Sequence, residues 1–261
     1  MAFRRITNLK HSEEIYEGRL IDDAQPFPTS LATVPLSNNC RTIDIFTPPP
    51  PNYDVALWLN GGSAYIDLGA SAAVPDTNNY TIEFWYFTFN TNVKFGRVFS
   101  QGSVALSTYQ IAIIHYFDYI SFCVGTGGTA YEEKSAWIWR DHWNHVAIVR
   151  ENNTQYSMYL NGDTAMIENS PLSSVTASGE MFIGCREGER NFAPVALSDF
   201  RIWNVSRTQT QIKDNMYTRL TGSETGLTHF WKLNDKSSTI TDSAGTMNGT
   251  AYNEYAWLPE R

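Results

Sequence analysis

LSDFRIWN, Leu197 to Asn204, is the stretch that decides the fold of this chain. Bulky apolar residues alternate in it with Ser198, Asp199 and Arg201. A period of two is typical of a β-strand with one covered face. The run stops at Asn204, so we expect a strand that ends there, with an acidic residue in the middle of its apolar pattern.

A short helix is expected directly after this strand. Ser206-Arg207-Thr208-Gln209 fits a capping box, and Ile212 and Met216 would share one face of the helix. We therefore expect the helix to start near Ser206. It is the one segment of the chain with a helical pattern of this kind.

Short apolar segments divided by polar loops fill the rest of the chain from Val55 onward. Tyr80–Phe89 is apolar on both alternating faces, which predicts a strand inside a covered sheet. Asn60-Gly61-Gly62 separates two short apolar strands with a turn of the hairpin type, and Asn161-Gly162 is the strongest hairpin signal. Further strands are expected at Arg97–Ser100, Gln110–Tyr116, Tyr119–Val124, Ala136–Trp139, Trp143–Arg150, Gln155–Leu160, Thr164–Ile167, Glu180–Gly184 and Leu227–Leu233. Many short strands with little helix indicate an all-β sandwich or barrel.

The first 46 residues differ in sequence pattern from the rest of the chain. Their apolar residues are scattered, and no helical or strand period lasts for more than a few positions. We expect residues 1–46 to form an extended arm that is ordered by packing on a partner or on its own domain; the alternative is a disordered tail. Residues 47–54 contain four consecutive prolines and predict a stiff linker. The sandwich would then occupy residues 55–252, and 253–261 would be a C-terminal tail.

Composition excludes several classes of partner. The formal net charge of −8, with 19 Lys and Arg residues, argues against nucleic acid and against an anionic membrane surface. No apolar run approaches the roughly 18 residues of a spanning helix, and no apolar core follows Arg4 and Arg5 as in a secretory signal. The three cysteines, Cys40, Cys123 and Cys185, are expected to be thiols rather than a disulfide framework.

Seven segments in order resemble the laminin-G-like, concanavalin A-like lectin/glucanase superfamily. They lie between about Val55 and Tyr252 and read LNGGSAYIDLG, YTIEFW, WNHVAIVR, YLNG, FIG, LSDFRIWN, and GLTHFWKLND followed by TDSAGTMNGT. The resemblance implies a two-sheet antiparallel jelly-roll sandwich. It does not fix the function, because this fold serves lectins, glycosidases, adhesion modules and viral fibres.

Catalysis is not expected. Glycoside hydrolysis needs two carboxylates that face each other across the scissile bond. The hydrolases of the superfamily carry acids on one strand in an E-x-D-x-(x)-E pattern, and Glu83 is followed on its face by Trp85 and Phe87 instead. His142 and His145 are three positions apart on a strand and would point to opposite faces, so they are not expected to share a metal.

The resemblance implies a structural calcium ion as a candidate cofactor. Jelly rolls of the superfamily often hold one with a carboxylate near the last strand and carbonyls of the opening turn, and oxygen is the ligand this ion prefers. Asp199 stands at the position that often supplies the carboxylate, and Gly69 is a carbonyl candidate. Asp242 and Asn60 are further oxygen-bearing candidates. The alternative is that Asp199 pairs with Arg201 or caps a turn.

Carbohydrate binding would need exposed aromatic and amide side chains. The candidates are Trp85, Tyr131, Trp137 and Trp139, whereas Trp143, Trp203 and Trp231 stand at core positions of the resembled family. A tryptophan in a strand is more often part of a core than a stacking platform, and each candidate has that alternative.

These observations favour a non-catalytic recognition or structural module. We expect its N-terminal arm, residues 1–46, to contact other protein subunits, and the sandwich to face outward and to bind cell-surface glycan. This architecture fits a bacteriophage virion protein, such as a head decoration, fibre or tail component. The alternatives are a free-standing, soluble carbohydrate-binding lectin and a glycoside hydrolase.

Overall fold

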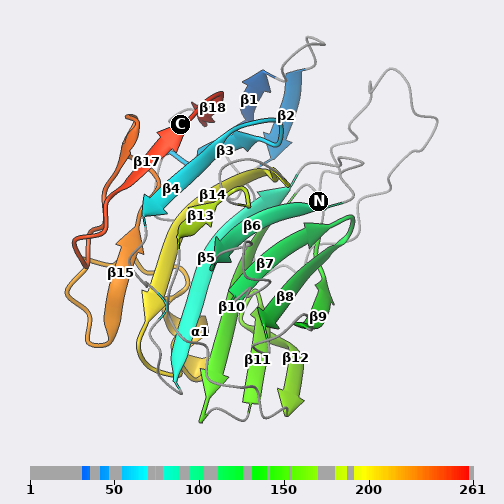
Figure 1. Cartoon of the computed structure of the whole chain (residues 1–261), viewed down its shortest axis with the longest axis vertical. Coiled ribbons are helices and arrows are strands. Elements are labelled where there is room, and N and C mark those ends of the chain that lie inside the picture. Colours follow the sequence, from blue (N-terminus) through cyan, green and yellow to red (C-terminus); the bar gives the residue numbers. More distant parts are fainter. Residues whose placement is uncertain are drawn as a thin grey trace, which may run out of the picture.

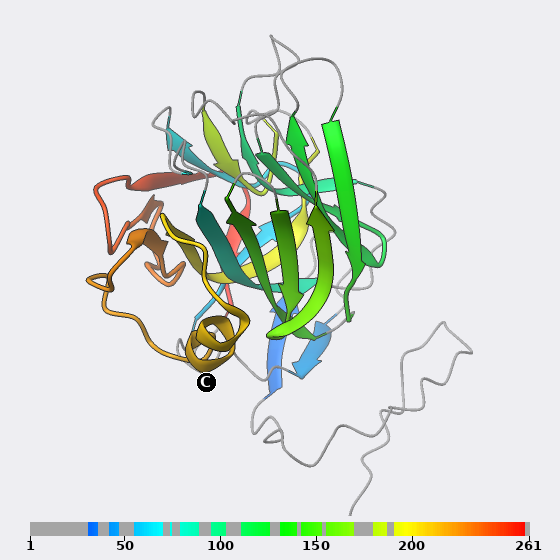
Figure 2. The same ribbon diagram turned by 90° about the horizontal axis from the view of Figure 1, so that it is seen from below.

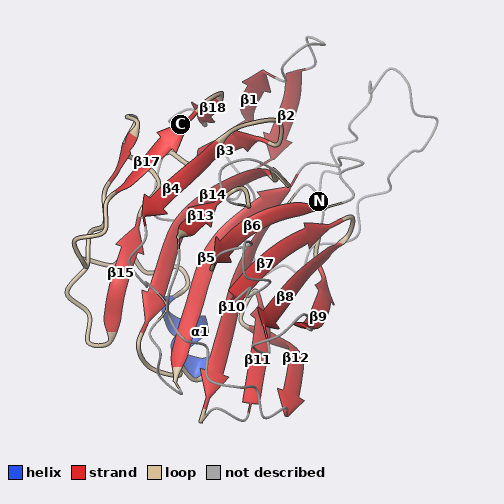
Figure 3. Cartoon of the chain, viewed as in Figure 1, coloured by secondary structure: helices blue, strands red, loops and turns tan. Residues whose placement is uncertain are grey.

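A computed structural model describes residues 31–35, 42–46, 55–69, 74, 79–88, 95–102, 111–125, 131–139, 142–152, 155–169, 180–186 and 191–258. Within these residues the chain forms two antiparallel sheets of eight strands, a separate two-stranded sheet and one short helix (Figure 3). The predicted all-β sandwich with one helix is confirmed. No helix among these residues is long and apolar enough to cross a membrane.

The first sheet has the strand order β12-β11-β10-β5-β14-β3-β18, with β15 paired to β14 (Figure 1). β5 and β14 lie at its centre, and every residue of both strands is buried. The strands are β3 (Leu57–Asn60), β5 (Tyr80–Thr88), β10 (Trp143–Glu151), β11 (Gln155–Leu160), β12 (Asp163–Asn169), β14 (Pro194–Trp203), β15 (Leu227–Trp231) and β18 (Tyr255–Trp257).

The second sheet has the order β16-β17-β4-β13-β6-β7-β8-β9. Its strands are β4 (Tyr65–Gly69), β6 (Gly96–Gln101), β7 (Ile111–Tyr116), β8 (Tyr119–Gly125), β9 (Tyr131–Trp137), β13 (Met181–Ile183), β16 (Thr239–Ile240) and β17 (Gly249–Tyr252). β9 starts at Tyr131, earlier than the predicted Ala136. Its first residues include Glu132, Glu133 and Lys134, which break the apolar alternation and are typical of an edge strand.

The core lies between the two sheets. It joins alternate residues of the central strands, such as Ile82, Phe84 and Tyr86 of β5, to Ile111 and Ile113 of β7. Phe200 of β14 stacks on Phe84 with 5.1 Å between ring centroids and contacts Phe99 of the second sheet. The tryptophans assigned to the core, Trp143, Trp203 and Trp231, are buried as predicted.

The two predicted turns have different outcomes. Asn161 and Gly162 join β11 to β12 with φ angles of 52° and 79°, the two positive values that a tight hairpin turn needs. The hairpin predicted at Asn60-Gly61-Gly62 is wrong. β3 pairs with β14 and β18, whereas β4 pairs with β13 and β17, so this turn carries the chain from one sheet to the other.

A β-bulge in β14 explains the acidic residue in LSDFRIWN. The pairing with β5 shifts between Ser198 and Arg201, and Asp199 has a φ of 60°. The additional residue reverses the alternation, so Ser198 and Arg201 both lie on the outer face of the first sheet. Without it, Arg201 would point into the core.

The bulge places Arg201 opposite Glu83, the buried charge at the centre of the outer face. Glu83 Oε1 lies 3.5 Å from Arg201 Nη1, accepts a hydrogen bond from Trp203 Nε1 at 2.7 Å, and pairs with Arg207. The Glu83 side chain is fully buried. We call Glu83, Asp199, Arg201 and Arg207 the ionic network.

The ionic network fixes the segment that follows β14 onto the outer face. Arg201 donates to the carbonyls of Asn215 and Thr218 at 3.1 and 3.0 Å, and Arg207 donates to the Gln211 carbonyl at 2.9 Å. Helix α1 (Gln209–Asn215) therefore lies over this sheet (Figure 2). Ile212 packs on Ala147 and Val149.

The predicted start of the helix needs a correction. Thr208, rather than Ser206, is the N-cap, and its capping partner is Gln211. Gln211 N donates to Thr208 Oγ1 at 3.2 Å, and Thr208 N donates to Gln211 Oε1 at 2.9 Å. Ser206 donates instead to the Arg150 carbonyl, because the chain still runs beside the end of β10 there.

Part of the N-terminal arm pairs with itself. β1 (Leu31–Pro35) and β2 (Thr42–Phe46) form the two-stranded antiparallel sheet, where sequence patterning predicted no strand. The TIDIF run of β2 does alternate, but it is a single five-residue segment among scattered apolar residues. Residues 1–30, 36–41 and the predicted linker 47–54 lie outside the described residues.

Removing the charge of Glu83 tests the role of the ionic network. Glu83→Ala leaves two buried arginines without their shared carboxylate and should lower the free energy of unfolding by about 3–5 kcal/mol in a urea titration. The control is Asp163→Ala, which breaks the 2.7 Å pair with Lys213 at a largely exposed position. We expect at most about 1 kcal/mol there. Equal effects of the two variants would contradict the assignment.

Candidate functional site

Exposed aromatic side chains gather where β7, β8 and β9 end at one end of the second sheet. The register pairs Tyr116 with Tyr119 and Tyr119 with Trp137, so the three residues lie side by side on the outer face. The ring centroids of Tyr119 and Trp137 are 4.0 Å apart. Trp137 is 65% exposed, which is unusual for a side chain of this size.

Trp139 lies beyond the end of β9 and is 67% exposed. Asn144, at the start of β10, holds its backbone: Oδ1 accepts from Trp139 N at 3.2 Å, and Nδ2 donates to Trp139 O at 2.8 Å and to His142 O at 3.0 Å. Asn144 is buried. We call Tyr119, Trp137 and Trp139 the tryptophan edge; its two indoles are carried by a backbone that the scaffold fixes.

The other two carbohydrate candidates do not join this group. Trp85 is 3% exposed and donates from Nε1 to the Met216 carbonyl at 2.9 Å, beneath the end of α1. Its ring therefore offers no face to a sugar, and its prediction as an exposed platform is corrected. Tyr131 begins β9, but its side chain lies outside the described residues.

The metal candidate Asp199 belongs to the ionic network. Its Oδ2 accepts a hydrogen bond from Arg201 Nη2, and it is 1% exposed. Burial raises the pKa of Asp199 to about 6, although Arg201 acts to lower it. A calcium ion at this carboxylate would have to displace the guanidinium, so Asp199 does not fit the ion and the alternative pairing with Arg201 describes it.

Two other predicted ligands are the side chain of Asn60 and the carbonyl of Gly69. Asn60 Oδ1 accepts from the backbone N–H groups of Gly62, Ser63 and Ala64. Gly69 ends β4, where its N–H donates to Asp67 Oδ1 at 2.7 Å. No cluster of three or more His, Cys, Asp or Glu side chains among the described residues could hold a metal ion. Because Asp199 is paired with Arg201 and Asn60 Oδ1 accepts from backbone N–H groups, these two predicted ligands do not fit a calcium ion.

Asp242 stabilises the turn after β16. Its carboxylate accepts from the N–H groups of Phe230, Ala244, Gly245 and Met247, and Oδ2 lies 2.7 Å from His229 Nδ1. Burial would raise the pKa of Asp242, but the bonds from His229 and these backbone groups lower it to about 2. It acts as a turn-stabilising carboxylate.

The lowered pKa of Asp242 predicts a contribution to acid stability. A depressed carboxyl pKa contributes stability above its unfolded value of about 3.9, and that contribution is lost as the pH falls toward 2. Wild type should therefore lose about 2 kcal/mol more than Asp242→Asn between pH 5 and pH 2. Denaturant titrations at several pH values measure this. Asp214→Asn, at an exposed position of α1, is the control and should lose as much stability in acid as wild type does. An equal loss for Asp242→Asn and wild type between pH 5 and pH 2 would contradict the prediction.

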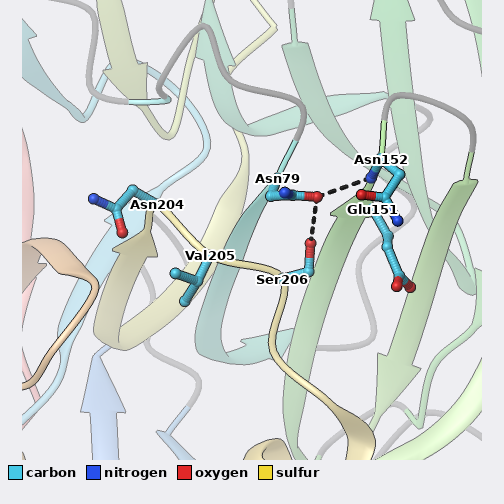
Figure 4. A pocket seen from close by; sticks show the side chains of 6 residues that line it. All are labelled: Asn79, Glu151, Asn152, Asn204, Val205 and Ser206. Atoms are coloured by element: carbon cyan, nitrogen blue, oxygen red, sulfur yellow. Dashed lines mark hydrogen bonds between the residues drawn. The ribbon is translucent and has the colours of Figure 1, made fainter.

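A polar hollow of about 240 Å³ lies where β5 begins and where β10 and β14 end (Figure 4). Asn79 Oδ1 accepts there from Asn152 N at 2.8 Å and from Ser206 Oγ at 3.1 Å. The remaining lining residues are Glu151, Asn204 and Val205. Because it has no aromatic lining and Asn79 Oδ1 is already bonded within the protein, the hollow is a weaker candidate than the tryptophan edge.

Tyr116 and Tyr119 were missed in the sequence. Their signal is the segment Tyr116-Phe117-Asp118-Tyr119, in which two tyrosines flank a two-residue turn. Residues at equal distance from such a turn face each other across the hairpin. Phe117 has a φ of 51°, as that turn requires.

Two eight-stranded antiparallel sheets around one core define a jelly-roll sandwich of the lectin type. A family model described as the concanavalin A-like lectin/glucanases superfamily matches residues 60–213, more than half of the chain. The chain belongs to this superfamily. A search of curated proteins finds no match to it.

Solved structures share the fold at low sequence identity. A protein of Bacteroides ovatus ATCC 8483, proposed to bind carbohydrate, is 18% identical with a TM-score of 0.58, over 79% of this chain and 60% of that one. The receptor-binding domain of botulinum neurotoxin D is 12% identical with a TM-score of 0.50, over 62% and 43%. This chain thus spans less than two thirds of the length of either similar chain.

Proposed function

We propose that the chain is a non-catalytic carbohydrate-recognition module that binds glycan at the tryptophan edge. The observation that carries the proposal is the exposure of Trp137 and Trp139, 65% and 67%, on a backbone held by paired strands and by Asn144. A large aromatic group left in water is informative, because burial would otherwise stabilise the fold.

The chemistry of the edge suits a sugar ring. The C–H groups on one face of a pyranose pack against an indole, while its hydroxyl groups need polar partners nearby. His142 is exposed, and its ring centroid lies 6.3 Å from that of Trp139. Ser135 is exposed two positions before Trp137 and shares a hydrogen bond with Ser121. Membership of a lectin-containing superfamily, and the carbohydrate binding proposed for the Bacteroides protein, support the same class of ligand.

The absence of catalysis is part of this proposal. Glu83, the acidic residue of the central strand, is fully buried and bonded to Arg207 and Trp203. A carboxylate held in this way cannot reach a glycosidic oxygen. The rival glycoside hydrolase predicts new reducing ends when the protein is incubated with any glycan that it binds.

A glycan array followed by calorimetric titration tests the proposed function. Trp137→Ala and Trp139→Ala should each weaken binding of the strongest array ligand at least about tenfold, the loss of roughly 1.4 kcal/mol expected of an aromatic hot spot. Ile167→Ala removes another exposed apolar side chain, on β12 of the other sheet, and should bind as wild type does. A flat array, or unchanged affinity in both tryptophan variants, would contradict the proposal.

We also propose that the N-terminal arm attaches the module to other protein subunits, as in a virion component. The supporting observation is the isolated sheet of β1 and β2, whose register pairs Ala32 with Ile45 and Val34 with Ile43. A two-stranded sheet is marginal in water by itself and gains stability by packing on another surface.

Deletion of residues 1–46 tests the attachment. The truncated protein should keep its unfolding midpoint and its glycan affinity but fail to co-purify with the particle or complex that retains the full chain. Retention of the truncated protein in that complex would contradict a role of the arm.

A further inference from the structure

Exposed aromatic side chains continue along the second sheet beyond the tryptophan edge. Six aromatic side chains are exposed among the described residues. Five of them belong to or adjoin strands of the second sheet, namely Phe95, Tyr116, Trp137, Trp139 and Tyr252, whereas the sixth, Tyr217, follows α1 and contacts Trp85 of the first sheet. The exposed aliphatic side chains of similar size, Ile167 and Val205, belong to β12 and to the loop after β14. Most of the exposed aromatic side chains are therefore gathered on the second sheet.

The far end of this series is a tyrosine pair. Tyr65 of β4 and Tyr252 of β17 are cross-strand partners, and their rings stack with centroids 5.1 Å apart and planes 18° apart. Tyr252 is exposed and Tyr65 half-buried. Two stacked rings at the surface offer a second flat apolar face, distant in the strand order from Trp137.

Phe192 and Phe95 connect the two groups. The ring centroids of Phe192 and Tyr65 are 6.3 Å apart, and Phe192 forms a bridge with Arg97 of β6. The guanidinium of Arg97 lies 5.8 Å from the Phe95 ring centroid. A Cβ on Gly96 would come within 2.8 Å of Ala193 Cα, so this glycine lets the segment that carries Phe192 lie against β6.

Phe95 connects this group of residues to the tryptophan edge. Gly96 pairs with His115, so Phe95 precedes β6 at the level of Tyr116. All of these residues lie at one end of the second sheet. On that side the neighbouring antiparallel strands begin or end at Tyr65, Gly96, Tyr116, Tyr119 and Trp137. We call Tyr252, Tyr65, Phe95, Tyr116, Tyr119 and Trp137 the aromatic strip.

The aromatic strip is longer than a single sugar. From β17 to β9 the sheet order contains six inter-strand steps. At about 4.8 Å per step, the strip spans roughly 29 Å. A monosaccharide or disaccharide would cover only part of this length.

We propose that the aromatic strip binds an extended, uncharged polysaccharide whose successive sugar rings contact it from the tryptophan edge to the Tyr65–Tyr252 pair. This rests on the proposed function and names its substrate class. Aromatic rather than aliphatic side chains line the strip, which suits ring faces of sugars. The net charge of −8 disfavours sulfated or carboxylated chains.

Chain length is the variable that tests this inference. Calorimetric titrations would use matched disaccharides and hexasaccharides of the cello-, xylo-, manno- and chito-oligosaccharide series, with heparin as the charged probe. In at least one neutral series the hexasaccharide should bind wild type at least tenfold more tightly than the disaccharide, a gain of about 1.4 kcal/mol. Tyr252→Ala should remove most of that gain and leave disaccharide affinity unchanged, because the disaccharide would occupy the tryptophan edge.

The outcomes separate this inference from the proposed function. Binding that depends on Trp137 but not on chain length would overturn the strip and leave the tryptophan edge in place. If Tyr252→Ala binds the hexasaccharide with wild-type affinity, the strip is likewise overturned and the tryptophan edge stays in place. Preference for heparin, or no binding in any of the four neutral series, would overturn the strip, whereas the glycan array judges the tryptophan edge independently. Ile167→Ala, with the thermal unfolding midpoint of each variant, controls for general effects on the surface.

Discussion

The buried charge of Glu83 is the constraint on which the first sheet depends. A carboxylate without solvent is stable only with charged or hydrogen-bonding partners, and here Arg201, Arg207 and Trp203 provide them. Burial would raise the pKa of Glu83, but Arg201 and Arg207 lower it below its usual value, so the group is held ionised. His145 is itself neutral at pH 7, because burial lowers its pKa to about 4.

This ion pairing determines what the outer face of the first sheet can do. The arginines that neutralise Glu83 also bind carbonyls of the segment containing α1, which therefore covers the face. Trp85 and Trp143 lie beneath it as packing residues. One face of the first sheet is core and the other is covered near its centre, whereas the second sheet carries most of the exposed aromatic side chains.

Sequence patterns predicted the positions of the strands better than the exposure of their side chains. LSDFRIWN, YTIEFW and WNHVAIVR form β14, β5 and β10 as expected, and Asn161-Gly162 forms its hairpin. Trp137 and Trp139, two of the four carbohydrate candidates, are exposed and alternate with the buried Ala136 and Ile138. Trp85 could not be separated from them, since it is covered by Met216, more than a hundred residues away. Asp199 breaks the alternating pattern because it lies in the β-bulge of β14. That bulge is defined by the pairing of β14 with β5, which the sequence of β14 alone does not show.

The central claim is that glycan contacts the tryptophan edge rather than the covered face or the polar hollow. The chain has eight tryptophans, and each indole N–H gives its own NMR signal. Titration of the ¹⁵N-labelled protein with a bound neutral oligosaccharide therefore identifies the contact directly. We predict that the indole signals of Trp137 and Trp139 shift while those of the buried Trp85, Trp143, Trp203 and Trp231 stay in place. Saturable binding that leaves both Trp137 and Trp139 unshifted would contradict the claim.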